Sequence, residues 1–272
     1  MIINGLKIEP NSELVYANLA STKMSMANLG GAKLIAANLI DSELRFAKLV
    51  KAIITSSSID RTDFSGADMF AVEMKGIAGP ASLFIGSNLN ESNLMLADLS
   101  GATLSNVQMN LSDLRGINFT GANLLSANVT SSRMDFSDCS QANLDKIDLS
   151  ETNLTGAQII RASARWANLT SAILNLSDAS WTNFNFAKFI GASCFQTNFA
   201  NANMTLADLT NANLMNANCH GTNFQRAKFI NANIDGINLT KANLRDATIT
   251  FDQLSSAGSL TSAIMPDGSI HP

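Results

Sequence analysis

Residues that could act as catalysts or metal ligands are scarce in this chain. Its 272 residues include only two histidines and three cysteines. Neither His220 nor His271 has a further group to orient it at a recognisable spacing, so general acid or base catalysis lacks a candidate. Cys139, Cys194 and Cys219 are too widely spaced for a disulfide framework or a metal site. Glycine-rich phosphate-binding loops are also missing. We predict that the protein is not an enzyme and holds no metal or cofactor.

Charged residues are also few, and neither sign is in large excess. Charged residues make up 15% of the chain, the formal net charge is −4, and no run of Lys or Arg occurs. Phosphate binding needs clustered positive charge, so we predict no direct nucleic-acid binding. The sequence also lacks a basic start followed by a long apolar stretch, and it has no apolar run of membrane-spanning length. We expect a cytoplasmic protein that does not enter a membrane.

A period of five residues dominates what is present. From Leu14 to Leu254, every position whose number ends in 4 or 9 holds Leu, Ile, Val, Met, Phe or Cys, with three exceptions. These exceptions are Gly79, Ala164 and Ala179. Two residues earlier, nearly every position holds Ala, Ser or Thr, and more than half of the positions between are Asn or Asp.

Regular helices and strands cannot use this period directly. Every fifth residue of an α-helix drifts around the axis, and every fifth residue of one strand changes face. If the chain turns after each pentapeptide, however, the small and the large residue both point inward from one short extended segment. Asn and Asp suit the bends because their side chains bond nearby backbone groups. The three cysteines fall at the large inward position, so we predict that they are core residues.

The repeats carry a recognisable signature, Ala-(Asp or Asn)-Leu-x-x, which stands at residues 97–101, 122–126 and 212–216. In this respect the chain resembles the pentapeptide repeat proteins, especially stand-alone members abundant in cyanobacteria. The resemblance implies an all-β, right-handed quadrilateral β-helix (solenoid) over residues 12–256. It also implies about twelve coils of four pentapeptides, in which residues twenty apart stack. Gly79 would then lie between Ile59 and Leu99, which could fill its gap.

Both ends of a stack of coils need a cap, because its outer backbone groups are unpaired. We predict that residues 1–11 form the amino-terminal cap and residues 257–272 the carboxy-terminal cap or tail. Thr250 and Gln253 have the spacing of a capping box, which predicts a short helix through about Ala257. A turn is expected over residues 265–269.

Residues 76–86 depart from the repeat. They include Gly79 at a large inward position and Pro80, the only proline inside the repeats. A proline removes a backbone donor, so we expect a local bulge or a short protruding loop. Its length must be a multiple of five, because the repeat resumes in phase. Such a loop could be functional or simply a decayed repeat.

Large apolar residues at outward positions make the candidate site. Trp166, Phe186 and Leu206 are twenty apart and would stack, while Trp181 lies one side earlier. Phe195 and Met215 would form a second short stack. Exposed aromatic residues often anchor interfaces, so we predict a protein-contact ridge from these six residues. The alternative is that corner geometry half-buries them against neighbouring coils.

Two functions are consistent with these features of the sequence. The first is a non-catalytic repeat scaffold or protein-interaction module with an unidentified protein partner, acting as a monomer or a homodimer. The second rests on the family, which includes quinolone-resistance proteins that interact with DNA gyrase, and it is a DNA mimic that inhibits or protects gyrase. A mimic requires negative charge along a narrow rod, and the charge here is weak.

Overall fold

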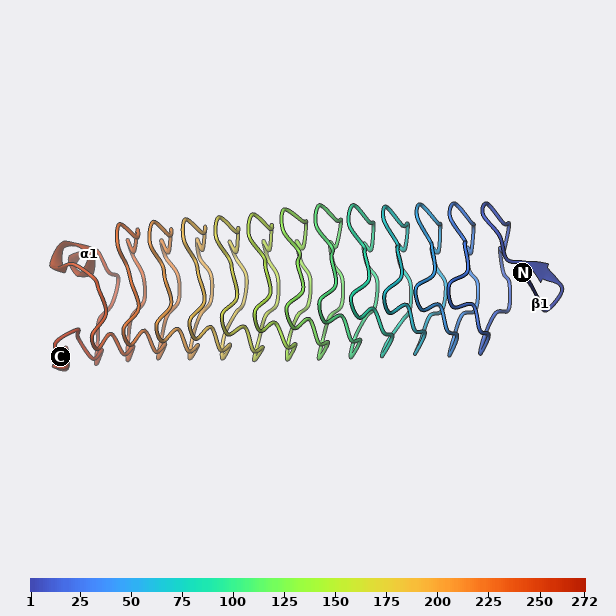
Figure 1. Ribbon diagram of the computed structural model, residues 1–272. Helices are drawn as coiled ribbons and strands as arrows, with labels where there is room; N and C mark the ends of the chain where they lie inside the picture. Colours follow the sequence, from blue (N-terminus) through green and yellow to red (C-terminus); the bar gives the residue numbers. More distant parts are fainter. The chain divides into compact units, whose positions relative to one another are not determined.

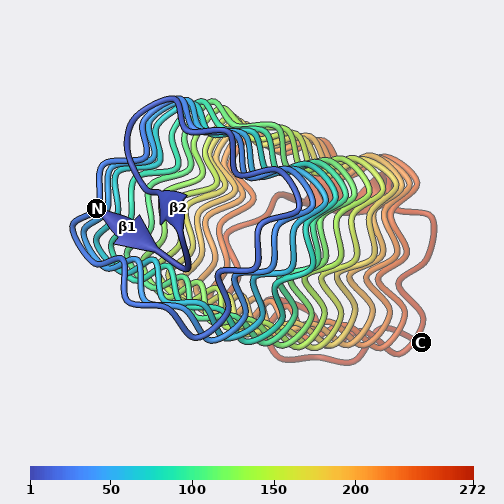
Figure 2. The same ribbon diagram turned by 90° about the vertical axis from the view of Figure 1, so that its right-hand side faces the viewer.

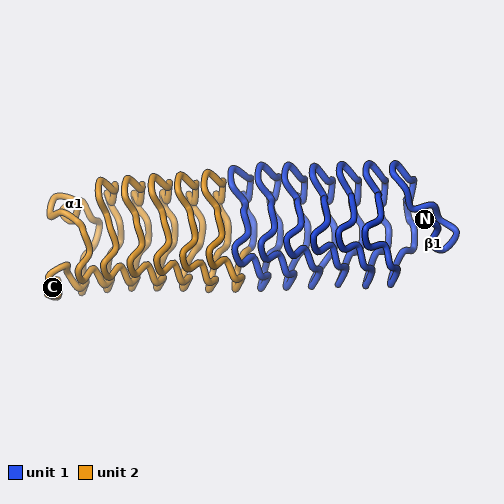
Figure 3. Tube along the Cα trace, viewed as in Figure 1, with its two compact units in different colours: residues 1–138 blue, residues 139–272 orange.

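Backbone pairing at a separation of 20 residues defines the architecture. The computed structural model describes residues 1–272 and divides into two compact units, Met1–Asp138 and Cys139–Pro272 (Figure 3). Within each unit, short parallel bridges join residues 20 apart, as Lys33 joins Ile53. Twenty residues therefore make one coil, and the coils of a unit lie one against the next (Figure 1). Each unit is a β-helix, as the sequence predicts.

Four tight turns divide each coil, one per pentapeptide. In one of these turns, the amide N–H of Ala17 donates to the carbonyl oxygen of Leu14 over 3.1 Å. Only the third residue of the turn, Tyr16, has a positive φ, of 57°. This is the pattern of a type II turn. Every position ending in 1 or 6, from Asn11 to Asp246, has the same left-handed conformation. Within each unit the turns of successive coils line up in rows (Figure 2).

The core is built from the two inward positions of each pentapeptide. The large residues at positions ending in 4 or 9 are buried, and only Ile249 is half-buried. At Gly79, an added Cβ would lie 2.7 Å from Cδ1 of Ile59 and 3.3 Å from Cδ2 of Leu99. These two side chains therefore fill the space that the glycine leaves, which confirms the prediction from the twenty-residue stacking.

The two inward alanines make room for phenyl rings. Phe184 and Phe199 stand 20 residues after Ala164 and Ala179, and all four are buried. The ring of Phe184 lies edge-on to those of Phe189 and Phe199, with centroids 5.1 and 6.0 Å away. Small residues at 164 and 179 thus compensate for a cluster of large rings in a narrow core.

Asparagine and aspartate side chains just before the turns accept hydrogen bonds from backbone N–H groups. Oδ1 of Asn183 accepts the N–H of Asn185 over 3.1 Å, and Oδ1 of Asn203 accepts that of Thr205 over 3.1 Å. Some amides also bond from coil to coil, as in the row Asn198, Asn218 and Asn238. The predicted role of these residues at the bends is confirmed.

Residues 76–86 form no bulge or protruding loop, which corrects the prediction made from their sequence. Ala78 pairs with Asp98 in the regular register. Pro80 takes the second position of a turn whose third residue, Ala81, has φ of 58°. Residues at this second position donate no backbone hydrogen bond to carbonyls of neighbouring coils. Because proline also favours the second position of type II turns, Pro80 fits without disrupting the coil.

A small hairpin stands at the amino terminus. Strands β1 (Ile2–Ile3) and β2 (Leu6–Lys7) pair antiparallel. Asn4 and Gly5 join them with φ of 51° and 78°, as a type I′ turn requires. Nδ2 of Asn4 donates to the carbonyl oxygen of Asn18 over 3.3 Å, which holds the hairpin against the first coil.

The helix α1 (Phe251–Ser255) lies near the carboxy terminus. Its capping box is present as predicted, because Thr250 accepts the N–H of Gln253 and the Gln253 side chain accepts that of Thr250. Nε2 of Gln253 also donates to the carbonyl oxygen of Phe229 over 2.7 Å, which ties the helix to the last coils. The helix ends before Ala257 because the chain then returns to the coil, where the N–H of Gly258 donates to Ile237.

The last residues follow the coil and then fold back on it. Ser259 and Ile264 make parallel bridges to the preceding coil, and Ile264 also pairs antiparallel with Ile270. The turn predicted over residues 265–269 is confirmed by a hydrogen bond from the N–H of Gly268 to Met265 over 2.9 Å. No helix of the chain is long and apolar enough to cross a lipid bilayer.

Candidate functional site

Three of the predicted ridge residues occupy the same turn in three successive coils. Trp166, Phe186 and Leu206 remain 48%, 41% and 40% exposed. The rings of Trp166 and Phe186 are parallel within 1°, with centroids 5.6 Å apart. Backbone hydrogen bonds from their N–H groups to the next coil fix this spacing. We call Trp166, Phe186 and Leu206 the tryptophan ridge.

An ion pair beside the ridge holds Trp166 in place. The guanidinium of Arg165 lies over the Trp166 ring, 5.4 Å from its centroid. Asp145, which is buried, accepts from Nε and the backbone N–H of Arg165 over 2.9 Å each and from Oγ of Ser163 over 2.6 Å. Such a fully bonded carboxylate fixes the guanidinium, and the guanidinium in turn supports the indole.

The same contacts set the protonation of this pair. Burial alone would raise the pKa of Asp145, but hydrogen bonds from Arg165 and Ser163 outweigh it and lower the pKa below its ordinary value of 3.8. The hydrogen bond with Asp145 raises the pKa of Arg165. Both groups are therefore charged at neutral pH, and the side chains beside Trp166 stay paired.

Trp181 lies at the neighbouring corner of the coil, in the turn just before that of Phe186. It is 58% exposed. The side of the coil between Trp181 and Phe186 carries Asn183, and the next coil carries Asn203 at the same place. Oδ1 of each asparagine is bonded to the backbone, while neither Nδ2 donates within the protein. The side of the coil that carries the free amide donors of Asn183 and Asn203 therefore lies between the corner of Trp181 and the corner of the tryptophan ridge.

Phe195 and Met215 lie elsewhere on the coil. The turn that contains Phe195 is two turns beyond that of Phe186, and a four-turn coil places it at the diagonally opposite corner. Met215 follows one coil later and is 38% exposed. Phe195 and Met215 are therefore separate from the tryptophan ridge, as a second short stack would be, and only Trp181 lies beside the ridge.

The backbone conformation at the ridge is unusual for large side chains. Trp166, Trp181 and Phe186 have φ of 57°, 61° and 62°. L-residues other than Gly, Asn and Asp seldom adopt this region, at a cost of about 1–2 kcal/mol each. Asparagine occupies the equivalent place in other turns, as at Asn201 and Asn216. Backbone geometry thus gives no reason to place tryptophan here.

The repeats matched by family comparison decide the class of protein. The model for pentapeptide repeats matches this chain over residues 12–49, 37–76, 82–116, 97–135, 132–170, 192–229 and 222–257. The chain belongs to the pentapeptide repeat family. No curated protein matches its sequence significantly.

Several solved structures of pentapeptide repeat proteins are similar to this one. HetL of the cyanobacterium Nostoc sp. strain PCC 7120, involved in heterocyst differentiation regulation, is 28% identical, with 92% of each chain covered and a TM-score of 0.26. Rfr23 of the cyanobacterium Cyanothece 51142 is 22% identical over 40% of this chain and 85% of its own, with a TM-score of 0.33. QnrB1, a plasmid-mediated fluoroquinolone resistance protein studied after trypsin treatment, is 18% identical over 72% of this chain and 81% of its own, with a TM-score of 0.33.

Positive charges surround the tryptophan ridge of this pentapeptide repeat protein. Lys146 precedes Trp166 by one coil, Arg161 precedes Trp181 by one coil, and Lys188 follows Phe186 on the next side. All three cations are exposed, and none makes an ion pair within the chain. Sequence reasoning missed this rim, although counting twenty residues back from each tryptophan would have found two of the three.

The remaining candidates for chemistry are placed in the core or apart from one another. Cys139, Cys194 and Cys219 are buried free thiols, and burial raises the pKa of Cys194 and Cys219. His220 is half-buried beside a turn, and Nδ1 of His271 lies near the last carbonyl oxygen. No group of three or more His, Cys, Asp or Glu is arranged to hold a metal ion.

Proposed function

We propose that this pentapeptide repeat protein is a non-catalytic scaffold that binds a protein partner through the tryptophan ridge and Trp181. The observation that carries the proposal is the parallel stack of Trp166 and Phe186, exposed at corners where the backbone favours asparagine or glycine. The same conformation recurs at every turn, so the exposed stack of the two rings, and not the backbone, points to a role outside the fold. Tryptophan is also the residue most enriched among the strong contacts of interfaces.

The charge around the ridge defines the partner's chemistry. Lys146, Arg161 and Lys188 have no ion pairs of their own, so a partner can bring carboxylates to them without breaking existing contacts. The amide donors of Asn183 and Asn203 would add hydrogen bonds to an extended acidic segment. Charges of this kind mainly accelerate association and make it sensitive to salt.

We propose that the architecture of the scaffold is that of other pentapeptide repeat proteins. In this proposal it winds as a right-handed quadrilateral helix of about twelve coils and works in the cytoplasm as a monomer or a homodimer. Apolar side chains are also exposed at other corners, such as Tyr16, Phe46 and Phe136, but the stack of Trp166 on Phe186 sets the ridge apart.

Affinity purification from the native host tests the role of the ridge. The bait would be the wild type, compared with a variant carrying Trp166→Ser, Trp181→Ser and Phe186→Ser. We expect a protein that copurifies with the wild type, is missing with the variant and dissociates at high salt. A variant with Phe195→Ser and Met215→Ser, at the opposite corner, is the matched control and should retain the partner.

Two outcomes would contradict the proposal. Identical partners for the wild type and the ridge variant would place the contact elsewhere. Recovery of only further copies of this chain, with light scattering showing a dimer that the ridge variant cannot form, would replace the foreign partner with self-association.

A further inference from the structure

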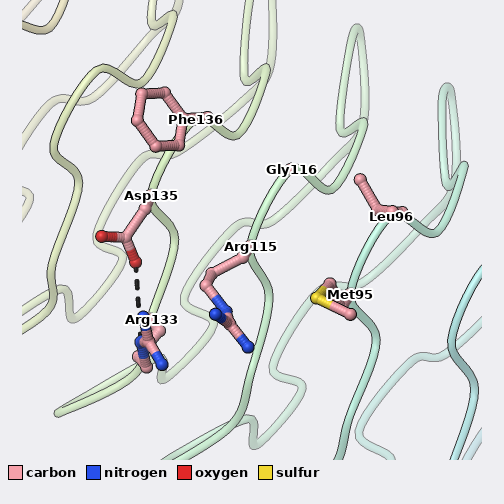
Figure 4. Close-up of a pocket in the computed structure, with 7 residues that line it drawn as sticks. All are labelled: Met95, Leu96, Arg115, Gly116, Arg133, Asp135 and Phe136. Carbon is pink, nitrogen blue, oxygen red and sulfur yellow. Dashed lines mark ion pairs between the residues drawn. The ribbon is translucent and has the colours of Figure 1, made fainter.

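A second surface feature, in the first unit, has the form of a small binding site. Leu96, Gly116 and Phe136 occupy the same turn in three successive coils. The large side chains are 62% and 72% exposed, and the glycine between them leaves a notch. A cavity of about 330 Å³ opens there, and Figure 4 draws the residues around it. It is lined by Met95, Leu96, Arg115, Gly116, Arg133, Asp135 and Phe136.

The directions of the Leu96 and Phe136 side chains leave the notch at Gly116 open. At Gly66, the ring of Phe46 covers the glycine, with ring atoms 2.5 Å from where a Cβ would stand. At Gly116, only Leu96 approaches the Cβ position, with Cδ2 at 2.8 Å, and no atom of Phe136 lies within 4 Å. Leu96 therefore leans over Gly116 as Phe46 leans over Gly66, and the apolar gap lies on the side of Phe136.

The backbone holds this gap in a fixed shape. The N–H of Leu96 donates to Arg115 and the N–H of Gly116 donates to Asp135, each over 2.9 Å. The turn at Gly116 closes with a hydrogen bond from Ile117 to Leu114 over 3.2 Å. A ligand would meet a preformed notch and would not have to order it, which favours binding.

Two guanidinium groups border the apolar gap. Figure 4 shows Arg115 and Arg133 extending along the side of the coils below the row of Leu96, Gly116 and Phe136. Arg115 uses Nε and Nη2 to bind Asp113, which leaves Nη1 without a partner. Nε of Arg133 lies 3.7 Å from Asp135, and neither terminal nitrogen of Arg133 donates a hydrogen bond.

We infer that this notch binds an apolar group that carries a carboxylate. The apolar part would enter between Leu96 and Phe136, over Gly116, and the carboxylate would accept hydrogen bonds from the free guanidinium nitrogens of Arg115 and Arg133. Planar guanidinium groups suit carboxylates in this way. The cavity volume lies at the small end of ligand pockets and suits a small apolar group such as a phenyl ring. A free aromatic acid and the carboxy-terminal residue of a peptide share this chemistry.

Calorimetry and amide NMR shifts with 3-phenylpropionate would test the inference on the full chain. We expect saturable binding, with shifts confined to residues 95–97, 114–117 and 133–137. The neutral analogue 3-phenylpropionamide should bind about tenfold more weakly, as should the acid to the Arg133→Gln variant. A second arm uses the peptide acetyl-Gly-Gly-Phe with a free or an amidated carboxyl end. Tighter binding of the free peptide than of 3-phenylpropionate identifies a chain terminus, and failure of the peptide identifies a small acid.

Gly116→Leu should abolish binding by filling the notch, because leucine is accepted at the same φ in Leu96 and Leu111. Gly101→Leu is the matched control: Gly101 has φ of 63°, nothing lies within 4 Å of its added Cβ, and it sits at another corner. Circular dichroism would verify that both variants fold. Absence of saturable binding to the wild type, equal binding of acid and amide, or unchanged binding by folded Gly116→Leu would each overturn the inference.

Discussion

The ring of Phe186 lies parallel to that of Trp166, one coil away, with a centroid distance of 5.6 Å and an interplanar angle of 1°. Neither ring belongs to the core, since both are exposed at turns with φ of 57° and 62°. Stacking of this kind contributes about 0.5–1.5 kcal/mol. The left-handed backbone costs about 1–2 kcal/mol at each of the two residues, which exceeds the gain from stacking, so the pair adds no net stability to the fold.

The double variant Trp166→Asn, Phe186→Asn should therefore lose partner binding while its free energy of unfolding changes by less than about 1 kcal/mol. Asparagine tolerates the left-handed region and offsets the lost stacking. Urea denaturation would measure stability, and affinity purification would measure binding. Leu111→Asn, at an exposed turn of the first unit with φ of 58°, is the control that should keep the partner. A fall in stability of several kcal/mol would show instead that the stack supports the fold.

The left-handed turns impose a rule on side-chain shape. No position ending in 1 or 6 between Asn11 and Asp246 holds Val, Ile or Thr. A β-branched side chain clashes with its own backbone in this region. The preceding turn position accepts such residues, as at Val50, Thr55 and Ile85. Asn106→Val should thus lower the free energy of unfolding by about 1–2 kcal/mol.

Ser105→Val in the same turn is the paired control, with an expected change within about 0.5 kcal/mol. Thermal and urea denaturation of the two variants would compare them directly. Equal losses at both positions would mean that side-chain contacts, and not backbone conformation, exclude β-branched residues from these corners.

Much of the fold could be predicted because the five-residue period of the sequence is also the spacing of the backbone turns. Leu14 and each later large inward residue mark one turn, so burial followed from the spacing alone. The absence of β-branched residues from the third position of each turn was also readable in the sequence, and it indicates the positive φ there. Pro80 misled the prediction because its effect depends on its place in the turn, where no backbone donor is lost.

The candidate site was harder to predict for a different reason. Spacing by twenty correctly stacks Trp166 on Phe186, but the corner that each outward residue occupies depends on counting turns around the coil. Phe195 therefore falls at the opposite corner from the ridge. The notch at Gly116 depends on the directions in which Leu96 and Phe136 lean, which no sequence pattern specifies.

Gly79 offers a test of how tightly the core is filled. Gly79→Ala would bring a methyl group against Ile59, whose Cδ1 would lie only 2.7 Å from it. We expect a loss of about 1–3 kcal/mol from overpacking. Ile59→Ala alone should cost about 2–5 kcal/mol by leaving a cavity. The double variant should cost less than the sum, by about 1 kcal/mol or more, because the new methyl occupies part of that cavity. Additive values from urea denaturation would mean that the two side chains do not share this space.

Gyrase provides a test of the alternative function. A DNA mimic presents negative charge comparable to phosphates, whereas several acids of this chain are bound to its own arginines. These acids are Asp41, Asp60, Asp63, Asp113 and Asp145. We expect DNA supercoiling by gyrase to be unchanged by excess protein, with and without a quinolone. Inhibition or protection at equimolar protein would restore the mimic as the leading function, and an unrelated repeat protein of similar charge is the control.

The buried carboxylates predict how stability depends on pH. Burial raises the pKa of Asp145 and Asp63, but hydrogen bonds, including those from Arg165 and Arg45, bring each below its ordinary value of 3.8. A carboxyl whose pKa is lower in the folded state stabilises the fold above its unfolded pKa. That contribution is lost as the pH falls from about 4 through the folded pKa. Unfolding by urea at pH 7 and at steps down to pH 2 should show this decline.

Asp145→Asn should flatten that decline, since the amide does not titrate, and should lower stability at pH 7 by leaving Arg165 without its acid. Asp178→Asn is a suitable control because no cation pairs with Asp178. If Asp145→Asn kept the full pH dependence of the wild type, the carboxylates responsible would lie elsewhere. Loss of Arg165's anchor should also free Trp166, so its fluorescence emission would shift in Asp145→Asn and stay unchanged in Asp178→Asn.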